Sequence, residues 1–170
     1  MDRRLGLGAI VVACWWVCLT PAPGRAESAA PSIAVTELGY IDSSGELRDQ
    51  HSDHARRLKS FVESLQDNLQ SSGKFRVVSL DCPADGCAAS TTDPAELIAK
   101  AEKAGANYVL VGGIHKMSTL VQWAKVEILN VGTRSVVFDR LLTFRGDDDA
   151  AWVHAETFLA REILDQNGFK

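Results

Sequence analysis

The chain has 170 residues, of which 46% are hydrophobic and 24% charged, and its formal net charge is −4. This composition is typical of an ordinary globular protein and excludes a collagen, a disordered tail and a polytopic membrane protein. The slight acidity argues against nucleic-acid binding, because proteins that bind nucleic acid usually carry a basic surface.

The first 26 residues have the pattern of a secretory signal peptide. Arg3 and Arg4 precede an apolar run over 5–19, and small residues follow up to Gly24-Arg25-Ala26. The apolar run is shorter than the ~20 residues that a membrane-spanning helix needs. We therefore expect cleavage after Ala26 and export to the periplasm.

Two alternatives would instead anchor the protein in a membrane. The signal could remain uncleaved, or Cys14, which follows Val11-Val12-Ala13, could be acylated as in a lipoprotein. Few apolar residues precede Cys14, and Trp15 and Trp16 after it are apolar where a lipoprotein tether is polar. The sequence favours a cleaved signal.

The mature chain is expected to have a flexible lead over 27–31 and a single domain over 32–168. Cys82 and Cys87 remain in this domain, and such a pair in an exported protein is expected to oxidise. Redox pairs usually have two intervening residues, and a zinc site would need a second cysteine pair. We therefore predict a structural disulfide, which contributes about 2 kcal/mol because its loop is short.

Hydrophobic patterns predict a strand and a helix in the first third of the domain. An apolar run over 33–38 is typical of a strand, and the polar stretch 42–46 indicates a loop. The helix that follows is expected to be capped by Ser52 or Asp53 and to end at Gly73.

The next segments alternate strand and helix. Residues 75–80 form a second strand, and Asp93-Pro94 starts a second helix that ends at Gly105. Residues 108–114 are nearly all apolar, which indicates a strand covered on both faces.

A hairpin and a last helix complete the domain. The two strands of the hairpin span 120–130 and 135–144, and the helix begins within 147–149. We favour helix capping by these three aspartates over calcium binding, because the alternating ligand spacing of a calcium loop is absent.

The resulting order is β-α-β-α-β-β-β-α, which predicts an α/β (α+β-like) domain. Strand–helix–strand units need parallel neighbours with right-handed crossovers, whereas the hairpin adds antiparallel strands at one edge. We predict a mixed five-stranded sheet in the order 2-1-3-4-5, with helices packed on the sheet and the first two helices on opposite faces.

Gly112-Gly113 at the end of the third strand makes the following residues candidates for ligand binding. Paired glycines allow close backbone approach or a bulge, and open α/β sheets bind ligands at the carboxyl ends of their strands. His115 and Lys116 lie at such an end. The alternative is a bulged strand whose polar residues face water.

One hypothesis combines this end of the strand with other cationic side chains in a pocket for a small molecule or an anion, with enzymatic activity as an option. The residues of this pocket would be His54, Arg57, His115, Lys116 and Arg145. His51 and His54 could share a metal, but the sequence places no third ligand nearby, so we predict no metal site.

No motif of an enzyme or of a cofactor site occurs in the chain. The phosphate loop, the dinucleotide fingerprint, the nucleophile elbow and the H-E-x-x-H pattern are all absent. We therefore predict no catalytic residue and no cofactor. The sequence favours a binding module over an enzyme.

The hairpin offers a different kind of site. Alternating residues of its strands share one face: Val121, Trp123, Lys125, Glu127, Val137 and Leu141. If no helix covers this face, Trp123 lies at the centre of a partly apolar surface that favours binding of a partner. The alternative is that the last helix covers it through Trp152 and Phe158.

The sequence resembles a family of secreted proteobacterial proteins filed as a domain of unknown function (number 2380), from Ile33 to Arg161. The residues that carry the resemblance are His54-Ala55-Arg56-Arg57-Leu58, Gly105-Ala106-Asn107-Tyr108, Gly112-Gly113-Ile114-His115-Lys116-Met117-Ser118-Thr119-Leu120, Phe144-Arg145-Gly146-Asp147 and Trp152.

More distantly, the element order is similar to that of the amino-terminal domain of TolB and of curli-secretion-type lipoproteins. These similarities imply an envelope adaptor or assembly module and transfer no catalytic role. We therefore expect an exported, non-catalytic binding or accessory protein with an envelope protein as its partner.

Overall fold

The computed structural model describes residues 29–83 and 86–169. The predicted signal peptide and Cys14 lie outside this part of the chain. The helices are α1 (His51–Ser71), α2 (Pro94–Lys103) and α3 (Asp149–Asp165). The strands are β1 (Ser32–Val35), β2 (Gly39–Asp42), β3 (Arg76–Val78), β4 (Tyr108–Lys116), β5 (Val121–Asn130) and β6 (Ser135–Arg145).

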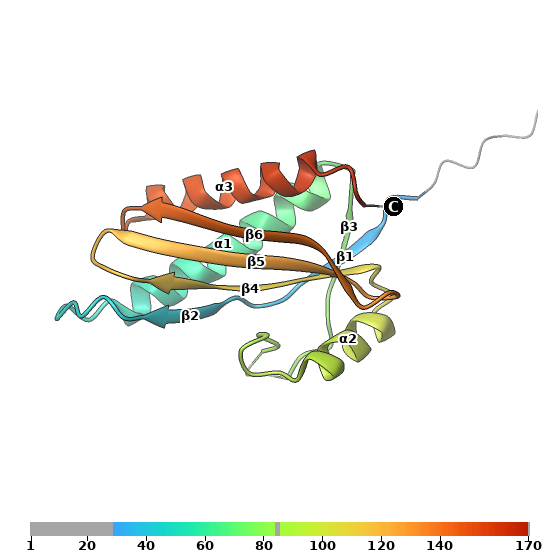
Figure 1. Cartoon of the computed structure of the whole chain (residues 1–170), viewed down its shortest axis with the longest axis horizontal. Coiled ribbons are helices and arrows are strands. Elements are labelled where there is room, and N and C mark those ends of the chain that lie inside the picture. The colour runs from blue at the N-terminus through green and yellow to red at the C-terminus, as the bar shows by residue number, and fades with distance from the viewer. Residues whose placement is uncertain (1–28, 84–85, 170) are drawn as a thin grey trace, which may run out of the picture.

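The strands form one mixed sheet, in which β3, β1, β4, β5 and β6 follow one another (Figure 1). β1 is parallel to β3 and to β4, whereas β4, β5 and β6 are antiparallel. Without β2, this order is the predicted 2-1-3-4-5. The predicted fold class is therefore confirmed.

β2 is a strand that the hydrophobic pattern did not predict. The chain bends after β1 and then continues parallel to β4, with Gly39 opposite Gly113. A Cβ atom on Gly113 would lie 3.1 Å from the carbonyl oxygen of Gly39, so two glycines allow the strands to approach closely here. β2 thus extends the sheet beyond the end of β1.

The helices cover the sheet unequally. α1 and α3 pack together on one face over the larger core, which includes Phe61, Tyr108 and Trp152. α2 packs on the opposite face over a smaller core, which includes Ala34 and Val109. The first two helices therefore lie on opposite faces, as predicted.

The ends of the helices follow the predicted signals except at the start of α1. Asp93 caps α2 by accepting from two backbone N–H groups, and Gly73 and Gly105 adopt positive φ just beyond α1 and α2. The predicted cap at Ser52 or Asp53 is wrong, because α1 already begins at His51. Its cap residue is Gln50, which makes no capping bond with its side chain.

Of the two options that the paired glycines left open, the structure shows close strand approach at Gly112 and no bulge. A Cβ atom at this position would lie 2.3 Å from the carbonyl oxygen of Lys125 on β5. β4 and β5 pair without a shift in register, and the shift in the neighbouring pair lies between Ile128 and Leu129.

The predicted disulfide between Cys82 and Cys87 is present, with their Cα atoms 5.5 Å apart. Cys87 is buried in the core beneath α2, so the bond attaches the loop after β3 to the domain. In the described parts of the chain, no helix is long and apolar enough to cross a bilayer.

Candidate functional site: an internal ion cluster and an uncovered sheet face

Lys116, the last residue of β4, is fully buried and points to the helix-covered side of the sheet. Its ammonium group donates to Asp147 at 2.6 Å, to Glu46 at 2.7 Å and to the side-chain oxygen of Gln50 at 2.5 Å. The alternation of side chains along β4 places Lys116 on the same face as buried Ile114. The loop between β2 and α1 supplies Glu46 and Gln50.

Asp147 is the centre of this group of charges, which we call the Asp147 cluster (Glu46, His54, Arg57, Lys116, Asp147). The Nε2 atom of His54 lies 3.0 Å from each carboxylate oxygen of Asp147. Arg57 donates to Asp147 at 3.0 Å and to Asp149 at 2.8 Å. α1 presents His54 and Arg57 one turn apart, so both reach the turn between β6 and α3.

The charges in the cluster stabilise one another against burial. Burial raises the pKa of Asp147, but hydrogen bonds from Lys116 and His54 outweigh it and lower the pKa below its ordinary value. Burial lowers the pKa of Lys116, and hydrogen bonds to Asp147 and Glu46 outweigh it and raise the pKa. Hydrogen bonds from Arg56 and Arg57 lower the pKa of exposed Asp149 to about 2. Asp147, Lys116 and Asp149 are therefore ionised and paired at neutral pH.

The five residues of the hypothetical anion pocket do not meet. His54, Arg57 and Lys116 converge on Asp147, but His115 points to the other face of the sheet, where its Nε2 lies 2.8 Å from the hydroxyl of Ser43. Arg145 is an exposed residue of β6. The expectation of a shared His115, Lys116 and Arg145 pocket is therefore wrong, because successive residues of a strand face opposite sides.

The aspartates before α3 have separate roles. Asp148 caps the helix by accepting from the backbone N–H of Ala151 at 2.8 Å, as predicted. Asp149 lies in the first turn and pairs with Arg56 and Arg57. Asp147 precedes the cap and turns inward, and no pattern in the sequence marked it as the partner of a buried lysine.

The face of the sheet opposite α1 and α3 is uncovered beyond the reach of α2. We call it the outer face (Ile41, His115, Trp123, Lys125, Leu141, Thr143). Ile41, His115, Trp123 and Thr143 are successive cross-strand partners on four strands. Leu141 lies in the next row, opposite Lys125. Ile41 is 62% exposed, Trp123 40% and Leu141 56%, so the two rows form an accessible apolar surface.

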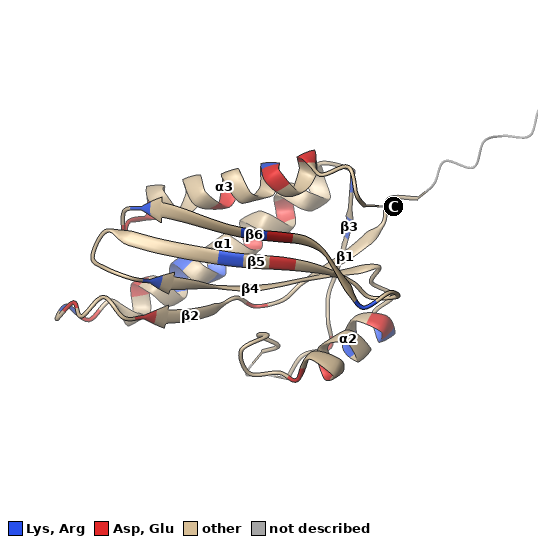
Figure 2. Ribbon diagram, in the orientation of Figure 1, with Lys and Arg blue, Asp and Glu red and all other residues tan. Residues whose placement is uncertain are grey.

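Charged residues border this apolar surface on one side. Lys125 pairs with Asp139 and, at 3.4 Å, with Glu127. Figure 2 shows the charges as neighbouring blue and red segments on β5 and β6, while the left-hand half of β5 is tan. The outer face therefore combines exposed aromatic and aliphatic side chains with a mixed-charge border.

The structure differs from two expectations about this face, its cover by α3 and the place of Val137. α3 does not cover it, because Trp152 and Phe158 pack on the opposite side of the sheet. Val137 does not join it either, because the register shift between Ile128 and Leu129 turns Val137 toward the larger core and leaves Val136 51% exposed instead. Ile41 could not have been found from the sequence, because β2 was not predicted.

The histidine pair at the start of α1 is split. His51 is exposed, whereas His54 is buried against Asp147 and lies 4.8 Å from the ring of Tyr40. Over the residues described, no group of three or more histidine, cysteine or acidic side chains is arranged to hold a metal ion.

A family model described as "Protein of unknown function (DUF2380)" matches residues 31–164. The chain belongs to this family. The match spans nearly all of the folded domain and includes the Asp147 cluster and the outer face. No curated protein matches the sequence.

Solved structures with a similar fold have low sequence identity to this chain. The C-terminal domain of LpoB from Escherichia coli is 20% identical, with a TM-score of 0.51, over 72% of this chain and 86% of that one. The hypothetical protein CT253 from Chlamydia trachomatis is 17% identical, with a TM-score of 0.51, over 80% and 94%.

TolB from Acinetobacter baumannii is 19% identical, with a TM-score of 0.50, over 79% of this chain. The matched region spans 27% of the length of TolB. At these identities the similarity establishes the fold.

Proposed function

We propose that the protein is exported to the periplasm and acts there as a non-catalytic binding or accessory module of the cell envelope. The observation that carries this proposal is the outer face. It presents Trp123 between Ile41 and Leu141 on a part of the sheet face that no described helix covers. Exposed apolar patches with an aromatic centre are typical of surfaces that bind another protein.

The internal ion cluster supports a binding role over catalysis. Lys116 and Arg57 carry positive charges near the strand ends, but Asp147, Glu46 and Asp149 neutralise these charges. Lys116 is also fully buried, so it is not available to a substrate. The cluster therefore has a structural role: it holds the loop after β2, α1 and the turn before α3 together.

The location rests on the sequence and on the similar folds. The basic and apolar start of the chain is typical of a secretory signal, and the disulfide suits an oxidising compartment. LpoB and TolB share the fold, which is consistent with the envelope adaptor role that the sequence resemblance implied.

The first test is a capture experiment from envelope extract of the native host. We expect the exported protein to retain a specific partner and Trp123→Ala to reduce its recovery about 30-fold, because a central tryptophan commonly contributes about 2 kcal/mol to binding. Val153→Ala is the matched control, since Val153 is an exposed apolar residue on α3.

A photo-crosslinking residue at position 141 or 153 distinguishes the two sides of the molecule in cells. The partner should crosslink from position 141 and not from position 153. Equal recovery with both alanine variants, or crosslinking only from position 153, would contradict the proposal.

A further inference from the structure

The β1–β2 side of the sheet has a free backbone edge. β3 pairs with β1 only from Ser32 to Ala34 and ends at Val78, and β2 pairs with β4 alone. From Val35 to Asp42 this edge therefore faces no other described strand. Free strand edges present backbone N–H and C=O groups to which an incoming strand can add.

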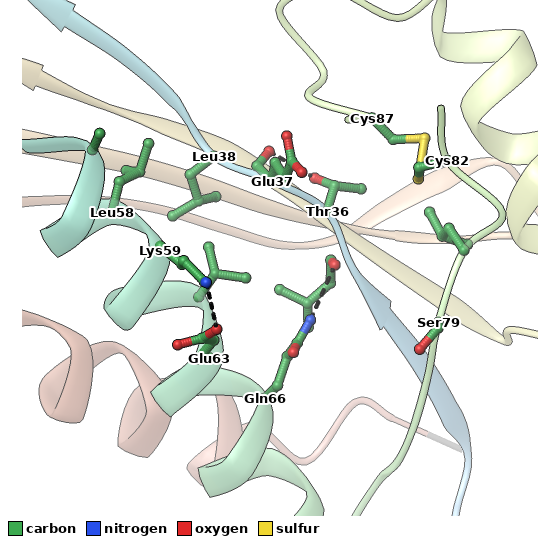
Figure 3. A pocket seen from close by; sticks show the side chains of 14 residues that line it. Thr36, Glu37, Leu38, Leu58, Lys59, Glu63, Gln66, Ser79, Cys82 and Cys87 are labelled. Atoms are coloured by element: carbon green, nitrogen blue, oxygen red, sulfur yellow. Dashed lines mark hydrogen bonds and ion pairs between the residues drawn. A yellow bond between two sulfur atoms is a disulfide. The ribbon is translucent and has the colours of Figure 1, made fainter. Parts of the chain in front are cut away.

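A side chain already satisfies one group of this edge. The amide of Gln66 on α1 donates to the carbonyl oxygen of Val35 at 3.5 Å, where a neighbouring strand would otherwise donate. Figure 3 shows this contact as a dashed line from Gln66. Gln66 thus closes one end of the open edge, which then continues toward β2.

A trough runs along the edge between β1–β2, α1 and the disulfide of Cys82 and Cys87 (Figure 3). It contains a cavity of about 560 Å³, with half-buried Leu58 and Val62 on the α1 wall and Leu80 on the far wall. Leu38 and Val35 line it from the strand side.

A second cavity of about 460 Å³ extends the trough to Tyr40 and Asp42 and shares Leu58 with the first. At ~3.3 Å per residue, the edge from Val35 to Asp42 matches a strand of about eight residues.

The charge along the trough is acidic. Glu37 lies in its wall, and the described residues give this carboxylate no hydrogen bond and no ion pair. Lys59, on the opposite wall, is only 3.8 Å from Glu63, so its charge is balanced there. The missing side chain of Gly86 lets its backbone lie directly beside Glu37, since a Cβ atom at Gly86 would overlap the carboxylate. An occupant with a basic group would therefore pair with Glu37.

We propose that this trough binds an extended segment of another polypeptide, apolar at alternate positions and carrying one basic residue that pairs with Glu37. The backbone of the segment adds to the free edge of β1–β2, and its apolar side chains lie between Leu58, Val62 and Leu80. An acyl chain would fill the apolar space but would leave the backbone groups of the edge unpaired. This site is separate from the outer face and extends the proposed function.

The test selects ligands from a phage-displayed library of random 12-residue peptides on the exported protein with its disulfide intact. Enriched peptides should alternate apolar residues and contain a lysine or arginine, and their affinity can be measured by fluorescence anisotropy. Glu37→Lys should weaken binding about tenfold, and Glu37→Gln should weaken it less.

Two controls separate this site from others. Asp67→Lys reverses an exposed carboxylate elsewhere on α1, and Trp123→Ala alters the outer face; both should leave the affinity within twofold of wild type. Thermal unfolding shows whether each variant is folded.

N-methylation of alternate peptide amides tests the backbone pairing. One of the two alternating sets should lose at least tenfold in affinity, because only one edge of the peptide meets β1–β2. The proposal fails if no peptide is enriched, if binding depends on Trp123 and not on Glu37, if both methylated sets bind equally, or if a fluorescent fatty acid displaces the peptides. If only Trp123→Ala lowers the affinity of the peptides, the trough proposal fails and the outer-face proposal stands.

Discussion

Asp147 shows how one carboxylate can hold three segments together. It accepts hydrogen bonds from Lys116 of β4 and from His54 and Arg57 of α1, and its side chain is only 9% exposed. Removing one partner of a buried ion pair commonly costs 3–5 kcal/mol, because the remaining charge stays buried without compensation. The cluster therefore depends more on Asp147 than on any one of its cations.

We expect Asp147→Asn to lower the free energy of unfolding by about 3 kcal/mol at pH 7, measured by chemical denaturation. Lys116→Met should cost on the order of 1 kcal/mol, because an apolar side chain fills the site and Asp147 keeps His54 and Arg57. An equal or larger loss in Lys116→Met would show that Asp147 is not the centre of the cluster.

The effect of Asp147→Asn on stability is expected to depend on pH. The pKa of Asp147 is lower in the folded protein than in the unfolded chain, so its contribution to stability is fully present above the unfolded pKa of about 3.9. That contribution is lost as the pH falls through the folded-state pKa. The difference in stability between wild type and Asp147→Asn should therefore shrink below about pH 4, and a constant difference from pH 7 to pH 3 would contradict this account.

At the scale of elements, the close approach of β4 and β5 depends on a missing side chain. A Cβ atom at Gly112 would meet a backbone oxygen of β5, which cannot move without breaking the pairing. The outer face is built on these two strands, so the same contact positions Trp123 beside His115.

We expect Gly112→Ala to destabilise the protein by about 3 kcal/mol in thermal or chemical unfolding. Gly132→Ala is the matched control, because its new Cβ atom would make only an ordinary contact, 3.6 Å from the side-chain oxygen of Asn130. Similar stability of the two variants would show that β4 and β5 can separate without cost.

At the scale of the whole molecule, the described domain offers two surfaces that we propose bind other polypeptides. The outer face lies on β2, β4, β5 and β6, and the trough lies between α1 and the β1–β2 edge. They adjoin at β2, where Ile41 belongs to the outer face and Tyr40 and Asp42 line the trough. Such a scaffold can hold two segments of one partner, or two partners, at once.

Export of the full chain gives a prediction for the molecule as it occurs in the cell. Mass spectrometry of the periplasmic product should show a chain that begins at Glu27 and lacks free thiols at Cys82 and Cys87. Cys14→Ser should leave this product unchanged. Loss of a lipid from the protein in Cys14→Ser would identify a lipoprotein instead.

The sequence by itself determined the order of the elements other than β2, the order of the other five strands in the sheet, and the disulfide. These features depend on local signals, such as the Asp93-Pro94 helix start and the short spacing of Cys82 and Cys87, together with the limited ways in which strand–helix–strand units can connect. β2 and the start of α1 escaped prediction, because β2 is stabilised by pairing with β4 and Gln50 supplies no capping bond.

Only the tertiary structure decided what the candidate residues do. His115 and Lys116 are adjacent in sequence, yet one faces the outer side and the other lies buried on Asp147, which is 31 residues away. Whether Trp123 is exposed depended on where α2 and α3 pack, and the trough exists because β3 ends at Val78. Burial, ion pairing and free edges arise from segments distant in sequence, so no local pattern contains them.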